Sequence, residues 1–158
     1  MINFSPIKDS HKKNLERYIR NKSVCKYLSW QSYNDEIKIK LYFEYAQNAN
    51  GYPDEILAII YEGNCIGSAH ILKRTNNITQ IGLGILPDFW GRGIGNECCK
   101  ELLKYLHTTK WTDGLDKIVT LIHRKNVAGI KIVLKNSFIE DKDQLGTKVN
   151  YIRYTFYL

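Results

Sequence analysis

Residues 85 to 97 read Ile85-Leu86-Pro87-Asp88-Phe89-Trp90-Gly91-Arg92-Gly93-Ile94-Gly95-Asn96-Glu97. An apolar, strand-like run ends at Pro87, and apolar residues at helical spacing begin at Ile94. The first N–H groups of a helix have no intrahelical partners, and the helix dipole places positive potential there. Glycines let an anion approach the backbone closely. The pattern therefore predicts an anion site at the start of a helix, with Arg92 as an added cation.

The spacing of the glycines distinguishes this turn from two well-known phosphate-binding turns. No Gly-Lys-Ser/Thr follows the turn, so it differs from the P-loop of nucleotide-hydrolysing enzymes. Gly91, Gly93 and Gly95 alternate, so they also differ from the Gly-x-Gly-x-x-Gly turn that binds dinucleotides. A pyrophosphate bound without a metal ion fits this turn best.

The elements around the turn predict a mixed sheet. Before it we expect strands at Ile2–Ile7, Glu55–Tyr61, Cys65–Lys73 and Ile78–Leu86, a helix ending near Arg20, and a helix after Asp35 that carries Ile37, Leu41, Tyr42 and Tyr45. After it we expect a helix from Gly93 to about His107, the strand Lys117–His123, a helix from Asn126 to about Lys135, and strands at Phe138–Asp141 and Val149–Leu158. A strand–helix–strand unit needs a right-handed crossover and hence one parallel pair. The fold class is therefore α/β (α+β), with a mostly antiparallel sheet.

Length and composition favour a single domain over residues 1–158. The chain has 44% hydrophobic and 25% charged residues, which is ordinary for a globular protein. No apolar run approaches the ~20 residues that cross a bilayer, and Lys8 to Lys13 interrupt any signal-peptide pattern. We expect a soluble, cytoplasmic protein without a membrane partner.

The net charge of +7 would attract phosphates, nucleic acid or acidic surfaces. The basic residues are scattered from Lys8 to Arg153 without a long run, which disfavours a dedicated nucleic-acid binder. Four cysteines occur without Cys-x-x-Cys spacing, at positions 25, 65, 98 and 99. We expect packed, reduced thiols and no metal site.

The turn Trp90-Gly91-Arg92-Gly93-Ile94-Gly95 resembles the signature Gln/Arg-x-x-Gly-x-Gly/Ala of the GNAT superfamily of N-acetyltransferases, with Trp90 in the place of Gln or Arg. This Trp, the loop from Val24 to Trp30, and Asn126 followed by Lys135 and Phe138 look like the branch of RimJ/RimL-like ribosomal-protein-alanine and spermidine acetyltransferases. The resemblance covers nearly the whole chain.

The resemblance implies a GNAT-like sheet of about seven strands with about four flanking helices, splayed at the site of acetyl-CoA, the expected cosubstrate. Pantetheine would lie along the strand end, the pyrophosphate would meet the amides of residues 92–96, and Asn126 would point toward the pantetheine arm. The cofactor-binding residues expected on this basis are Ile85, Leu86, Gly91, Arg92, Gly93, Ile94, Gly95, Asn96 and Asn126.

The sequence offers several candidates for the groups that remove and donate protons. The branch commonly has a Glu where this chain has Gln80, which cannot act as a base, and many family members have a Tyr where Val133 stands. A relocated base or deprotonation by solvent would account for this. His123 and His70 are candidate bases, and Tyr151 is a candidate proton donor, although each also suits ordinary packing.

Aromatic side chains near the expected acceptor mouth, Tyr27, Trp30 and Tyr33, could surround a cationic amine. We expect acetyl transfer to a primary amine of a peptide or small molecule by direct attack in a ternary complex. The alternatives are a catalytically silent CoA-binding or nucleic-acid-associated module and an aminoglycoside-type resistance acetyltransferase. The oligomeric state is open, a homodimer included.

Overall fold

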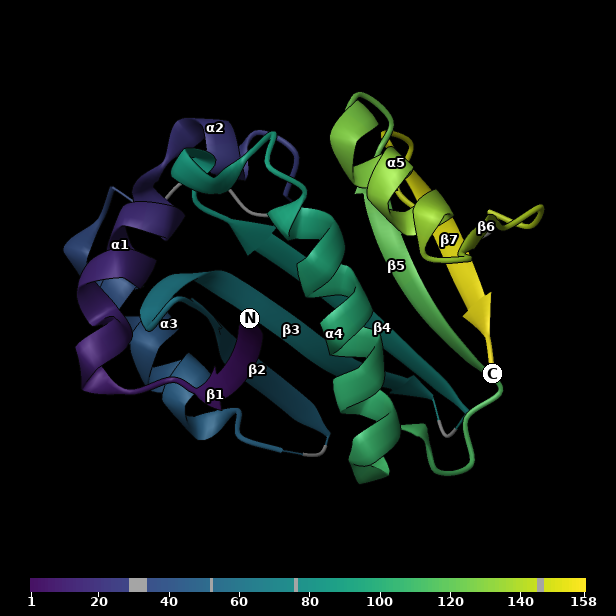
Figure 1. The fold of residues 1–158 in the computed structure, drawn as a ribbon, viewed down its shortest axis with the longest axis horizontal. Coiled ribbons are helices and arrows are strands. Elements are labelled where there is room, and N and C mark those ends of the chain that lie inside the picture. The colour runs from purple at the N-terminus through teal and green to yellow at the C-terminus, as the bar shows by residue number, and fades with distance from the viewer. Residues whose placement is uncertain (29–33, 52, 76, 145–146) are drawn as a thin grey trace.

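A seven-stranded sheet in the order β1-β2-β3-β4-β5-β7-β6 forms the centre of the molecule (Figure 1). The computed structural model describes residues 1–28, 34–51, 53–75, 77–144 and 147–158. The strands are β1 (Ile2–Pro6), β2 (Asp54–Tyr61), β3 (Asn64–Thr75), β4 (Ile78–Ile85), β5 (Lys117–His123), β6 (Ile139–Glu140) and β7 (Tyr151–Tyr157). The helices are α1 (Lys12–Arg20), α2 (Lys22–Cys25), α3 (Glu36–Asn48), α4 (Ile94–Thr108) and α5 (Val127–Lys135), with 3-10 turns η1 (Asp9–His11), η2 (Pro87–Phe89) and η3 (Lys110–Thr112).

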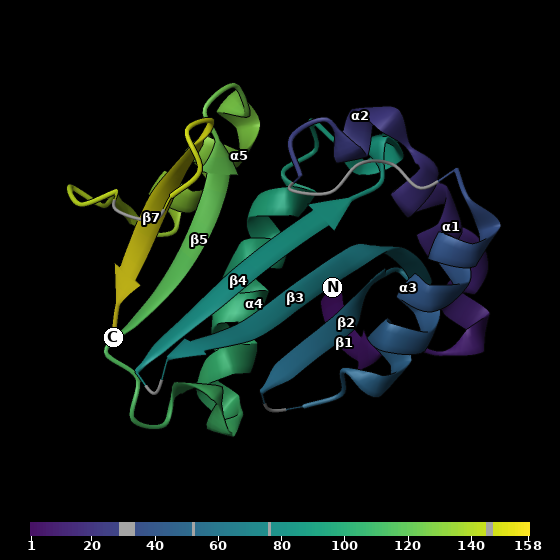
Figure 2. The same ribbon diagram turned by 180° about the vertical axis from the view of Figure 1, so that it is seen from behind.

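The predicted mixed α/β fold is confirmed. All neighbouring strands pair antiparallel except β4 and β5, which pair parallel through the crossover helix α4. Helix α4 lies in front of the sheet in Figure 1 and behind it in Figure 2. One core lies between α4, α5 and the sheet, and a second core joins α1 and α3 to the opposite face.

The sheet opens between β4 and β5. These strands pair only from Ile78 to Gln80, opposite Lys117 to Val119. Beyond Gln80, β4 continues to Ile85 along β3 while β5 diverges from it, as both views show (Figures 1 and 2). This is the splay that the sequence resemblance implied.

Two features of the helical regions differ from expectation. The short helix α2 was not predicted and is capped by Asn21, whose Oδ1 accepts from the amide of Ser23 at 2.9 Å. In α3 the predicted apolar residues Ile37, Leu41 and Tyr45 are exposed, whereas Ile39, Phe43 and Ala46 are buried. That part of the prediction is wrong because apolar residues occur all round this helix, so periodicity could not choose the buried side.

All four cysteines are buried thiols, as predicted. Among the described residues, no helix combines the length and the apolar character needed to cross a bilayer.

Candidate functional site

The glycine turn before α4 has open space beside its backbone and lies at the positive end of the helix dipole. Gly91 and Gly93 adopt φ angles of +71° and +80°, which favour glycine, and a Cβ on either would meet nothing within 4 Å. No backbone N–H from Gly91 to Gly95 has a hydrogen-bond acceptor among the described residues. The turn opens the 15-residue helix α4, and the Arg92 side chain is exposed beside it. These features suit a large anion at the helix N-terminus.

Trp90 fixes this turn to the end of β4. Its indole N–H donates to the carbonyl oxygen of Ile85 at 2.9 Å. In the sequence, Trp90 was a departure from the family signature that resembled the RimJ/RimL-like branch. The structure adds the reason for an N–H donor at this position, because the carbonyl of Ile85 faces the side from which β5 has departed.

Gly95 and Asn96 lie where α4 meets α5. A Cβ on Gly95 would stand 3.0 Å from Cδ1 of Ile132, so this glycine allows close helix packing. The amide of Asn96 donates to the Gly93 carbonyl at 3.0 Å, and its side-chain oxygen accepts from Asn136 at 3.0 Å. The Ile94 side chain is buried in the core. Contacts of Gly95, Asn96 and Ile94 with a cofactor stay predictions. For Ile94 the prediction concerns the backbone alone, because the side chain is buried.

The edge of β4 that faces the opening carries unpaired backbone groups. The amide of Leu86 donates to Ile66 at 2.8 Å, so it faces β3 and is already used. Backbone groups alternate sides along a strand, so those of Leu83 and Ile85, which lie beyond the last residue paired with β5, face the opening instead. Apart from the Ile85 carbonyl, this edge can receive an extended ligand as a further strand.

Asn126 caps helix α5. Its Oδ1 accepts from the amide of Gly129 at 3.0 Å, and a Cβ on Gly129 would lie 2.7 Å from the Asn126 side-chain nitrogen. Capping alone accounts for Asn at this position. Its predicted orientation toward a pantetheine arm stays a prediction.

A cavity of about 260 Å³ lies beside the opening of the sheet. Residues that line it include Tyr27, His70, Arg74, Gln80, Lys148 and Tyr151. The structure thus brings together three of the residues predicted for catalysis or acceptor binding, and it leaves His123 outside the lining. Trp30 and Tyr33 lie outside the described residues.

His70 is held as a neutral imidazole. Its Nε2 lies 3.3 Å from Oγ of Ser68 on the same face of β3, as the alternation predicted. Burial lowers the pKa of His70 to about 4, because the low-dielectric surroundings penalise the imidazolium form. At neutral pH the His70 ring therefore carries one N–H proton and no charge.

The buried His70 should make stability fall in mild acid. The unfolded chain binds the proton with a pKa of about 6.5 and the folded chain only near 4, so the unfolded state gains protons first as pH falls. We expect His70 to remove about 2 kcal/mol of unfolding free energy between pH 7.5 and pH 5. Urea denaturation at both pH values should show this loss in the native chain and not in His70→Gln. An equal loss in both proteins would contradict the buried imidazole.

His123 is packed rather than open. Its Nδ1 accepts from the amide of Lys125 at 3.1 Å, which leaves the proton of the neutral ring on Nε2. The ring lies against those of Tyr27 and Tyr151, with centroid distances of 5.4 and 5.2 Å. This geometry gives His123 a role in positioning the two tyrosines, and its action as a base stays a prediction.

Tyr151 connects the cavity to the loop after α2. Its hydroxyl donates to the carbonyl of Leu28 at 3.0 Å, and burial raises its pKa. Tyr151 therefore keeps its proton at neutral pH and can serve as a hydrogen-bond donor.

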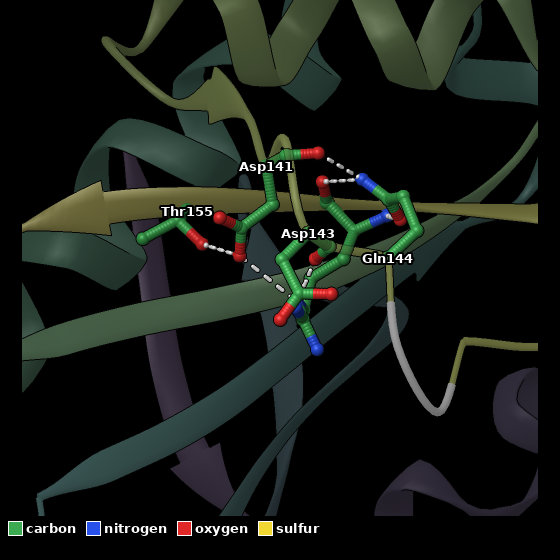
Figure 3. Close-up of polar contacts among 5 residues, drawn as sticks. Asp141, Asp143, Gln144 and Thr155 are labelled. Carbon is green, nitrogen blue, oxygen red and sulfur yellow. Dashed lines mark hydrogen bonds and ion pairs between the residues drawn. The ribbon is translucent and has the colours of Figure 1, made fainter.

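A polar cluster around Arg153 holds the segment after β6 against β7 (Figure 3). Arg153 Nε lies 2.8 Å from Oδ2 of Asp141, which also accepts from Thr155 Oγ1 at 2.8 Å. Gln144 accepts the Arg153 amide at 2.8 Å, and Arg153 also donates to the Asp143 carbonyl. Burial works to raise the pKa of Asp141, but its bonds from Thr155 and Arg153 outweigh this and lower it.

This cluster tethers the chain just before Lys148 and Tyr151 reach the cavity. Sequence reasoning missed it, since an aspartate and an arginine 12 residues apart give no periodic signal. Only the pairing of β6 with β7 brings them together.

A model of the acetyltransferase (GNAT) domain family matches residues 2–139 of the chain. Solved structures with the same fold include the ribosomal-protein acetyltransferase RimL in complex with coenzyme A, at 14% identity and a TM-score of 0.80, covering 99% of this chain and 94% of that one. Spermidine N-acetyltransferase from Vibrio cholerae, in complex with CoA and spermine, has 13% identity and a TM-score of 0.77, with coverages of 99% and 94%. The microcin C7 self-immunity acetyltransferase MccE, in complex with acetyl-CoA and AMP, has 17% identity and a TM-score of 0.79, with coverages of 99% and 92%.

Proposed function

Since this chain belongs to the acetyltransferase (GNAT) family, we propose that it transfers an acetyl group from acetyl-CoA to a primary amine by direct attack in a ternary complex. As a member of the family it is an acetyl-CoA-dependent N-acetyltransferase. One observation carries the proposed mechanism: the unpaired edge of β4 lies between the open glycine turn and the cavity. A thioester held along that edge would meet an amine in the cavity.

The residues of the turn and of the β4 edge fit the parts of coenzyme A. The free amides from Gly91 to Gly95 and the cation of Arg92 would hold the diphosphate, where a Cβ on Gly91 or Gly93 would occupy open space. The backbone groups of Leu83 and the amide of Ile85 would pair with the amide groups of the pantetheine arm. When bound, acetyl-CoA supplies the acetyl group as a reactive thioester.

The backbone of this edge also contributes to catalysis. An N–H group of β4 that faces the opening can donate to the thioester carbonyl oxygen, which is worth a few kcal/mol where charge develops on that oxygen, about 3 in comparable sites. Holding amine and thioester together supplies much of the remaining acceleration.

No described Asp or Glu lines the cavity, so the proton steps of the reaction depend on other groups. Gln80 accepts hydrogen bonds but no proton, and the low pKa of His70 makes it too weak a base to hold the amine proton near neutral pH. We assign to His70 a hydrogen bond to the amine, while the acceptor loses its proton to water before it attacks. Tyr151, which keeps its proton, would donate to the departing thiolate by exchanging its hydrogen bond to the Leu28 carbonyl for one to the sulfur.

Thiol release tests the proposed reaction. Acetyl-CoA incubated with the protein and a panel of amines should release CoA in equal amount to acetylated product, as measured with a thiol reagent and mass spectrometry. Acetyl-CoA without an amine controls for hydrolysis. Binding of acetyl-CoA by calorimetry, with no amine raising thiol release above that control, would leave the silent CoA-binding module instead.

The proposal also covers the branch of the family to which the chain belongs and the acceptor that it acetylates. We place the chain with the RimJ/RimL-like and spermidine acetyltransferases on its Trp90-containing turn, and its relatives named above differ in what they bind. The acceptor must therefore be inferred from this chain's own cavity.

A further inference from the structure

We propose that the acceptor is a small amine that carries a negatively charged group, bound by Arg74 and Lys148. This inference rests on the proposed acetyltransferase function and specifies its second substrate. Arg74 at the end of β3 and Lys148 before β7 are the charged side chains among the described residues that line the cavity.

No carboxylate balances these two cations. Neither Arg74 nor Lys148 forms an ion pair with a described carboxylate, and no described Asp or Glu lines the cavity. The residues outside the described ranges carry no acid either, since they are 29–33 (SWQSY), Tyr52, Asn76 and 145–146 (LG). An acceptor with an anionic group would complete the charge pairing of this cavity.

Gln80 orients Arg74 without neutralising it. The Nε of Arg74 donates to Oε1 of Gln80 at 2.8 Å, across the hairpin of β3 and β4. A glutamate at position 80 would form an ion pair with Arg74 in the same place. With glutamine, no negative charge at position 80 compensates the guanidinium. Its planar fork is therefore available to a carboxylate or phosphate.

Asp54, a carboxylate on the same face of the sheet as Arg74, has the Tyr45 hydroxyl as its hydrogen-bond partner. It lies opposite Leu72 of β3, and the Tyr45 hydroxyl donates to it at 3.4 Å. A third cation adjoins a residue that lines the cavity, since Lys26 Nζ lies 5.1 Å from the ring centre of Tyr27. The charged groups in and beside the cavity are therefore positive, and a polyamine would place its extra ammonium groups against like charges.

Matched pairs of amines test this charge preference. The pairs are β-alanine with β-alaninamide and phosphoethanolamine with ethanolamine, and spermidine serves as the polycation. We expect the anionic member of at least one pair to have a kcat/KM at least about tenfold above its neutral partner, with spermidine below both. The two pairs distinguish a carboxylate from a phosphate.

Two variants assign the preference to the cavity. In Arg74→Gln and in the near-isosteric Gln80→Glu, which should keep cooperative unfolding, the ratio of anionic to neutral kcat/KM should fall by about tenfold through the KM of the anionic amine. Lys38→Gln, which removes one exposed cation from α3, should leave the ratio unchanged.

The outcomes separate the two proposals. Equal rates within both pairs, a preference for spermidine, or a ratio that survives in both variants would overturn the anionic acceptor and leave the acetyltransferase function intact. Failure of every amine to release CoA from bound acetyl-CoA would overturn the proposed function and this inference with it.

Discussion

Gly93→Asp is expected to weaken acetyl-CoA binding by at least about a hundredfold, because it places a carboxylate in the anion cradle at the start of α4. Two like charges about 4 Å apart near a protein surface repel by about 4 kcal/mol. The φ angle of +80° adds a smaller conformational cost, since Asp tolerates this region better than most residues. Isothermal titration with CoA measures the effect.

Two controls separate charge from backbone strain. Gly93→Asn adds nearly the same bulk without the charge and should lose much less affinity. Gly114→Asp repeats the charge and a φ of +71° in an exposed turn beyond α4, and it should bind CoA like the native chain. Native affinity in Gly93→Asp would contradict the placement of the diphosphate.

Gly67→Ala is expected to lower the free energy of unfolding by at least about 3 kcal/mol, because β3 and β4 leave no room for a side chain there. A Cβ at Gly67 would lie 2.0 Å from the carbonyl oxygen of Gly84 and 2.8 Å from Cα of Ile85. Both contacts are with backbone atoms, so relief requires a shift of the strands. Urea denaturation measures the loss.

Gly82→Ala is the matched control for this prediction. Gly82 lies on β4, two residues from Gly84, and a Cβ on it would meet nothing within 4 Å. We expect a change of less than about 1 kcal/mol, of either sign. A similar large loss in both variants would show that β-strand glycines are generally required here, independently of the close approach at Gly67.

Most elements could be predicted because their signals are local. A strongly apolar run predicted β5 over its full length, and the apolar face of α4, with Ile94, Cys98 and Leu102, is buried as expected. Among the α-helices of the described residues, α2 was missed and the buried side of α3 was predicted wrongly. A four-residue helix has no period to detect, and apolar residues all round α3 leave its buried face to the partner elements.

Some features of the candidate site could be predicted from the sequence, and others could not. The glycine turn and the strand before it are contiguous patterns, so the sequence could predict them. Asn126 was named from the family resemblance, and its role as the cap of α5 was not predicted. The bond from Trp90 to Ile85, the placement of His123 outside the cavity lining, and the Arg74–Gln80 pair depend on side-chain directions that no spacing rule specifies.

The chain's order of strands and helices, its parallel crossover and its glycine turn follow from the sequence by itself, because each arises among residues close together along the backbone. The charge of the cavity was decided only by the tertiary structure. Arg74, Gln80, Lys148 and Tyr151 come from three strands and a loop, and which of them share one hollow depends on where β4 and β5 separate. That separation is a property of the packed sheet, since its strands meet only after the intervening helix has folded onto them.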